Sequence, residues 1–156
     1  MHNPCEKTLY LYCQVLQKVR KIGNMADRAV HPLCTQHGIT GLQLGILLFL
    51  HNGGPQTISA IAQNIGMAGA NNSALCKRLE KKGLLQRERD ENDERQVLVH
   101  LTPEGERLLD EMNGQCGEWQ QRLLTHISIQ EIEQALEAME TVVAAMEAAE
   151  RICTDG

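Results

Sequence analysis

The chain has 156 residues, the length of one compact domain rather than two. Its 20 acidic residues outnumber its 15 lysines and arginines, and the net charge of -5 excludes a protein that is basic over its whole surface. Apolar residues make up 42% of the chain but aromatic residues only 3%. The core must therefore be built from aliphatic side chains, which favours helices over a sheet sandwich.

The sequence also indicates where the protein is located. It lacks the roughly 18 to 20 consecutive apolar residues of a membrane span, and its first residues lack the order of a signal peptide. We therefore expect a cytoplasmic protein without a membrane partner. The six cysteines are spread along the chain without a CxxC pair, and in a reducing compartment we expect them to be free thiols.

Two helices are predicted in the first third of the chain. From about residue 6 to 30 apolar residues recur at spacings of three and four, which predicts one long amphipathic helix that ends at Pro32. A second helix is expected to begin after Thr40, because Thr40 and Gln43 have the spacing of a capping box. Residues 42–50 are nearly all apolar, so we expect this helix to be buried on most sides.

A pair of short helices comes next. Thr57 is placed to cap a helix over 58–65 that Gly66 closes. Another helix is predicted over 68–82, and it runs into a concentrated basic segment, residues 77–89, in which six lysines and arginines stand against two glutamates. Two helices joined by a tight turn beside a basic segment are typical of a helix-turn-helix.

The apolar period then changes from helix-like to strand-like. Residues 84–89 and 97–101 are predicted to form two short strands around a charged loop, which is a hairpin or wing. Thr102 is expected to cap a further helix, and Ser128 and Glu131 form a capping box for a last, long one. The predicted fold class is mainly α with a small β-hairpin wing.

Five segments, in this order and spacing, resemble the MarR family (multiple antibiotic resistance regulators). They are ITGLQ (39–43), ISAIAQNIG (58–66), RLEKKGLL (78–85), RDENDER (89–95) and LTPEG (101–105). The resemblance implies one MarR-like domain over 1–156. In it, 40–103 would form a winged helix-turn-helix DNA-binding lobe, and 6–38 and 104–153 would supply dimerisation helices.

The resemblance also implies a set of DNA-binding residues. On the recognition helix these are Asn71, Asn72, Ser73, Lys77 and Arg78. An asparagine can bond adenine through two hydrogen bonds, and the cations can neutralise phosphates. The alternative is an ordinary solvated helix face.

The wing would contribute a second contact. Arg95 lies at the position of the family's wing arginine, which enters a minor groove, and Asp93 is placed to hold it. The family commonly has Asp-Arg-Arg here, whereas this chain has Glu94 between Asp93 and Arg95, which weakens phosphate attraction. The alternative is a surface ion pair of less than roughly 1 kcal/mol.

The expected function is that of a transcriptional regulator, a repressor in most such families, which binds a pseudo-palindromic duplex as a homodimer. The resemblance also implies a small-molecule effector between the first helix and residues 42–50, where aliphatic side chains would favour an apolar or aromatic compound. No enzyme motif and no cofactor motif is present. Two alternatives stay open: a redox-sensing regulator that uses Cys13, and a winged helix that binds only another protein.

Some cysteines and histidines have spacings that suggest a metal site or a reactive thiol. His31, Cys34 and His37 have a zinc-like spacing, but the resemblance would require a histidine pair after the wing, and only His126 is present there, so no metal ligand is assigned. Cys76 lies on the recognition helix at a spacing that can turn it into the core, and packing is its expected role.

Overall fold

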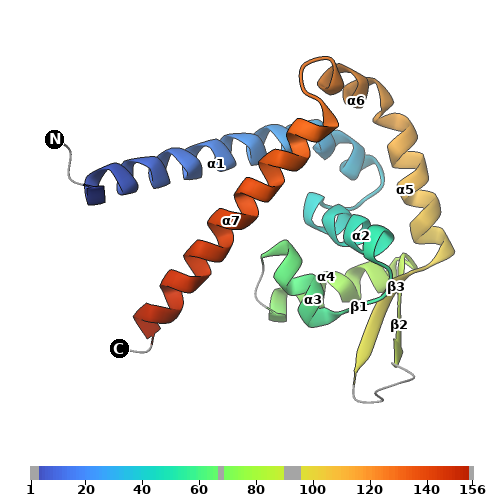
Figure 1. Ribbon diagram of the computed structural model, residues 1–156. Coiled ribbons are helices and arrows are strands. Elements are labelled where there is room, and N and C mark those ends of the chain that lie inside the picture. Colours follow the sequence, from blue (N-terminus) through green and yellow to red (C-terminus); the bar gives the residue numbers. More distant parts are fainter. Residues whose placement is uncertain (1–3, 67–68, 90–95, 155–156) are drawn as a thin grey trace. The chain divides into compact units, whose positions relative to one another are not determined.

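The computed structural model describes residues 4–66, 69–89 and 96–154. Contacts along the chain divide it into two compact units, residues 1–115 and 116–156. The first unit contains α1 (Pro4–Gln36), α2 (Gly41–Gly53), β1 (Gln56–Thr57), α3 (Ile58–Ile65), α4 (Gly69–Lys81), β2 (Leu85–Arg89), β3 (Val97–Leu101) and α5 (Pro103–Gln115) (Figure 1). The second contains α6 (Gly117–Leu124) and α7 (Ile129–Thr154).

The first helix is longer than predicted, because α1 runs through Pro32 and ends only at Gln36. A proline inside a helix removes one backbone hydrogen bond, yet it does not stop the last turn when other contacts hold that turn. Here Cys34 is buried in the core. Gly38, at φ +64°, ends the helix, and the Ile39 N–H donates to the Cys34 carbonyl at 2.9 Å, as in a Schellman motif.

The second helix begins as predicted but is less buried than predicted. The Gln43 N–H donates to Thr40 Oγ1 at 3.2 Å and the Thr40 N–H donates to Gln43 Oε1 at 3.0 Å, which completes the capping box. Ile46 and Leu47 are fully buried, whereas Leu42 and Leu48 are exposed. The expectation that α2 is buried on most sides is therefore wrong, because its apolar residues also occupy the exposed side of the helix.

The sheet has three strands where two were predicted. Its order is β1-β3-β2, with β2 and β3 antiparallel in the register Leu85 opposite Leu101, and with Gln56 of β1 opposite Val99. β1 has only two residues and follows Pro55, so it left no alternating pattern in the sequence. Because Thr57 belongs to β1 and also caps α3, the sheet fixes the start of the helix-turn-helix.

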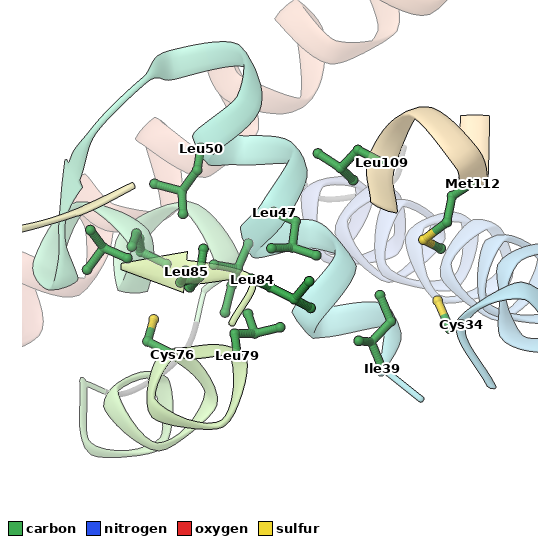
Figure 2. Close-up of a cluster of buried hydrophobic side chains, with 13 residues drawn as sticks. Cys34, Ile39, Leu47, Leu50, Cys76, Leu79, Leu84, Leu85, Leu109 and Met112 are labelled. Atoms are coloured by element: carbon green, nitrogen blue, oxygen red, sulfur yellow. The ribbon is translucent and has the colours of Figure 1, made fainter. Parts of the chain in front are cut away.

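The core of the first unit joins the helix-turn-helix to α2, the sheet, the end of α1 and α5. Ile46, Leu47, Ile61, Leu79 and Val99 are all fully buried in it. At its α1–α5 end, the sulfur atoms of Cys34 and Met112 point toward one another (Figure 2). A hydrogen bond of 2.6 Å between His51 Nδ1 and Glu106 Oε2 also links α2 to α5.

Local caps start the two later helices. Thr102 Oγ1 accepts the Gly105 N–H at 3.1 Å and donates to the Gly83 carbonyl at 2.6 Å, so α5 begins where the turn after α4 ends. In the second unit the Glu131 N–H donates to Ser128 Oγ at 3.2 Å and the Ser128 N–H donates to Glu131 Oε2 at 2.8 Å. These bonds to the Glu131 carboxylate lower its pKa. Both predicted caps are confirmed.

The architecture confirms a mainly α fold with a winged helix-turn-helix. The assignment of 6–38 and 104–153 to dimerisation stays a prediction. Among the described helices no single one combines the length and apolarity of a membrane span; α1 from Lys7 and α2 meet that measure only as a pair bent by 89°.

Candidate nucleic-acid interface

The helix-turn-helix is formed by α3 and α4, and α4 is its second helix. The Ala60 N–H donates to Thr57 Oγ1 at 3.1 Å, which satisfies one free amide at the start of α3. Gly66 then adopts the left-handed conformation that closes α3. In winged-helix proteins this second helix enters the major groove, so the side chains that α4 presents outward decide what the site can bind.

One face of α4 is buried and the other is exposed. Asn72, Cys76 and Leu79 lie at helical spacings of four and three, and each is at most 1% exposed. The remaining face is exposed and polar apart from Ala74; it carries Asn71, Ser73, Lys77, Arg78 and Lys81. We call these five polar side chains the α4 outer face.

Asn72 differs from the sequence expectation that it contacts bases. Its side chain is 0% exposed, and its Nδ2 donates to the Ile58 carbonyl at 2.8 Å. Cys76 Sγ lies 3.9 Å from its Oδ1. Asn72 thus joins α4 to the start of α3, and it cannot reach a groove while this packing persists. The spacing from Asn72 to Cys76 and Leu79 was the signal that could have found this.

Cys76 packs as predicted. Burial raises the pKa of its thiol, against an opposing effect of the Arg87 guanidinium. A buried, protonated thiol behaves as a small apolar side chain rather than as a nucleophile.

The positive charge around α4 is mostly free. Lys77, Arg78, Lys81 and Lys82 are exposed, and none of them has an ion-pair partner in the parts of the chain that the structure describes. The nearest acid on this helix, Glu80, is engaged instead by Arg87, whose Nε lies 3.2 Å from Glu80 Oε2. Free cations on an exposed helix face are what phosphate binding requires. The sequence expectation omitted Lys81, although it lies in the basic segment 77–89. Lys82 follows the helix and is not part of the α4 outer face.

The wing is described only in part. β2 and β3 form the antiparallel pair that was predicted, and His100 Nε2 on β3 lies 3.3 Å from Glu88 Oε2 on β2. The two strands project beyond the helices of their unit (Figure 1). Asp93 and Arg95, the predicted wing contacts, lie outside the described residues.

The other cysteine and histidine candidates are dispersed. Cys13 is exposed on α1. Cys34 is 1% exposed and belongs to the core, which separates it from the exposed His31. Over residues 4–66, 69–89 and 96–154, no group of three or more potential metal ligands comes together.

Known proteins share this sequence pattern. The sequence model of the MarR family matches residues 37–96. The helix-turn-helix-type transcriptional regulator YwoH of Bacillus subtilis is 30% identical over 115 residues, which cover 74% of this chain and 80% of YwoH. YkoM of the same organism is 32% identical over 77 residues, 49% of this chain and 50% of YkoM. The chain thus spans only about half the length of YkoM.

Solved structures share the fold. AbfR of Staphylococcus epidermidis has a TM-score of 0.81 at 20% identity, covering 94% of this chain and 99% of AbfR. A structure of reduced AbfR bound to DNA has a TM-score of 0.69 at 22% identity, covering 92% and 98%. BldR from Sulfolobus solfataricus has a TM-score of 0.71 at 23% identity, covering 92% and 99%.

The fold and the α4 outer face define a winged helix-turn-helix protein. The match to YwoH over most of both chains, together with the family match through the lobe, makes the assignment specific. The chain belongs to the MarR family of transcriptional regulators.

Proposed function

We propose that this protein binds duplex DNA through the α4 outer face and represses transcription as a homodimer. The observation that carries the proposal is the division of α4 into a face buried by Asn72, Cys76 and Leu79 and an outer face with free cations. That AbfR, which shares the fold, has been solved bound to DNA supports the same use of this helix. A regulator of chromosomal genes works where the chromosome is, in the cytoplasm.

The α4 outer face is proposed to make two kinds of contact, one to base edges and one to phosphates. Asn71 and Ser73 lie near the start of α4, the end that meets base edges in this class, and their amide and hydroxyl groups can read those edges. Lys77 and Arg78 lie one turn further along and would bind phosphates, fixing the register without reading sequence. Arg95, held by Asp93, is proposed to enter the adjacent minor groove.

Exposed apolar side chains support the homodimer. On α1, Leu9, Leu16 and Ile22 are 64%, 42% and 56% exposed, and on α7, Leu136 and Val143 are 55% and 54% exposed. Such contiguous apolar stripes on a monomer mark an interaction surface. A second copy related by a two-fold axis would cover them and set two α4 helices about one DNA turn apart.

The modulation of DNA affinity by a small molecule is also part of the proposal. The alternative of a redox signal depends on Cys13, whose exposure leaves its thiol accessible in the single chain. Peroxide treatment of the wild type and of Cys13→Ser separates the two signals. If Cys13 is a redox sensor, peroxide should lower the DNA affinity of the wild type and leave that of Cys13→Ser unchanged.

The test of DNA binding is selection from a random duplex library, followed by fluorescence anisotropy with the selected duplex and a scrambled one across a salt series. We expect a pseudo-palindromic sequence and a preference of about a thousandfold or more over the scrambled duplex, with affinity falling steeply as salt rises. Failure to enrich any sequence, with weak and equal binding to all duplexes, would contradict the proposal and favour a protein-interaction module.

A further inference from the structure

The first unit contains a cavity that the proposed DNA contacts do not use. Its volume is about 690 Å³, within the usual range for small-molecule sites. It is lined by the turn that follows α1, by the turn that follows α4 and by α5, and not by residues 42–50, where an effector is expected from the sequence.

Lys82 brings positive charge to the lining of this cavity. Lys82 is exposed directly after α4, and its Nζ lies close to Gly38, since a Cβ added at Gly38 would be 3.3 Å from it. His37 also lines the cavity, and its Nε2 is buried without a hydrogen-bond partner among the described residues. A buried polar atom left unsatisfied costs stability, which is a common mark of a functional position.

The opposite charge comes from α5. Asp110 and Glu111 line the cavity, and neither has an ion-pair partner among the described residues. Glu104 and Arg107 line it too, but they pair with each other and neutralise one another. The unpaired charged side chains that line the cavity are therefore one ammonium and two carboxylates, and the ammonium nitrogen lies more than 4.0 Å from the carboxylate oxygens.

The lining of the cavity also includes apolar side chains. Leu84 is 7% exposed, and Leu108 is partly buried against the core beside it. A ligand that satisfies all three features has a carboxylate for Lys82, an ammonium for Asp110 and Glu111, and a short hydrocarbon skeleton over the two leucines.

We propose that this cavity binds a small zwitterion of the amino-acid class. Binding itself does not require DNA. Its regulatory consequence rests on the proposed function: Lys82 directly follows α4, so a ligand that joins it to Asp110 ties the recognition helix to α5 and changes the affinity for DNA.

Three probes of equal chain length separate the charge requirements. Isothermal titration calorimetry of the full chain without DNA would use 6-aminohexanoate, hexanoate and hexylamine. We expect 6-aminohexanoate to bind at least about fivefold more tightly than either single-charge probe, because only it can pair with Lys82 and with the carboxylates at once. Equal affinity of hexylamine and 6-aminohexanoate, or no binding of 6-aminohexanoate, would overturn the proposal.

Two exposed substitutions locate the site without threatening the fold. Lys82→Met should weaken 6-aminohexanoate binding about three- to tenfold and leave hexylamine unaffected, whereas Asp110→Asn should weaken 6-aminohexanoate and leave hexanoate unaffected. Lys7→Met makes the same change on α1, away from the cavity, and should bind 6-aminohexanoate like the wild type. Equal loss in all three variants would place the zwitterion elsewhere and refute the site.

The link to regulation has its own readout. Anisotropy of the selected duplex, with and without saturating 6-aminohexanoate, should show a change in DNA affinity of about fivefold or more, which Lys82→Met abolishes. An unchanged affinity despite calorimetric binding would refute the regulatory link while the ligand site stands. Loss of DNA binding in every condition would instead refute the proposed function, because calorimetry does not depend on it.

Discussion

The lobe and the long helices α1 and α7 differ in how far their apolar side chains are exposed. In the lobe, side chains such as Ile46, Ile61 and Val99 are 0% exposed, so the chain buries them by itself. On α1 and α7, residues of the same kind, such as Leu9 and Leu136, stay 64% and 55% exposed. Apolar burial drives folding at about 25 cal/mol per Å². The lobe is therefore stabilised by its own core, while the long helices leave large apolar side chains exposed in the single chain.

This comparison predicts that overpacking is costly where a helix packs on the lobe and harmless on an exposed helix surface. A Cβ at Gly105 would lie 2.4 Å from the Leu84 carbonyl oxygen, which is fixed backbone. Gly105→Ala should lower the free energy of unfolding by about 3 kcal/mol. Gly114→Ala, in the same helix, meets nothing within 4 Å and should be neutral or stabilising. Urea denaturation checks both, and equal stability of the two variants would refute the close approach.

Adjacent asparagines sharpen the comparison within α4. Asn72→Ala removes the hydrogen bond to the buried Ile58 carbonyl and should cost about 2 kcal/mol of stability. Asn71→Ala alters only the exposed α4 outer face, so it should leave stability within about 0.5 kcal/mol and weaken specific DNA binding. Thermal unfolding and anisotropy on both variants test this, and the reverse pattern would show that Asn72, not Asn71, faces the groove.

The long helices should respond to charge on their apolar stripes. Leu16→Glu places a carboxylate where α1 is proposed to contact a second copy, and should raise the dimer dissociation constant at least about tenfold. Gln17→Glu adds the same charge at the next, exposed position and should leave the dimer intact. Sedimentation equilibrium measures both. An unchanged dimer in Leu16→Glu would remove α1 from the interface.

The smallest effect concerns thiol reactivity. Burial raises the pKa of Cys76, so the folded state favours the protonated thiol over the thiolate. The free energy of unfolding should therefore be highest below the ordinary thiol pKa and should fall as pH rises above it. Maleimide labelling near neutral pH, read by mass spectrometry, should modify the exposed Cys13 well before Cys76. Labelling of Cys76 at the rate of Cys13 in native buffer would show that α4 opens readily.

What the sequence predicted was mostly local. The caps at Thr40, Thr57, Thr102 and Ser128 were predictable because each depends on residues three positions apart, and the hairpin because its period changes within a few residues. The continuation of α1 through Pro32 was not, because contacts distant in sequence hold the last turn of that helix.

Two features of the site could not be predicted from the sequence, because they also depend on contacts between distant segments. Asn72 and Asn71 are chemically identical neighbours, and only the packing of α4 against Ile58 decides which of them is buried. The cavity beside α5 is lined by His37, Lys82 and Asp110, which come from three separate segments. No local sequence motif could therefore predict it. Asp93 and Arg95, expected at the wing, stay predictions.

The central claim is that the α4 outer face binds phosphate, and the salt dependence of DNA affinity tests it most directly. The double variant Lys77→Gln/Arg78→Gln removes two cations per protomer. In a dimer the slope of log affinity against log salt should therefore become shallower by about 3 to 4. The control Lys7→Gln/Lys21→Gln makes the same charge change on α1 and should keep the wild-type slope. Equal slopes for the wild type and both variants would contradict the claim.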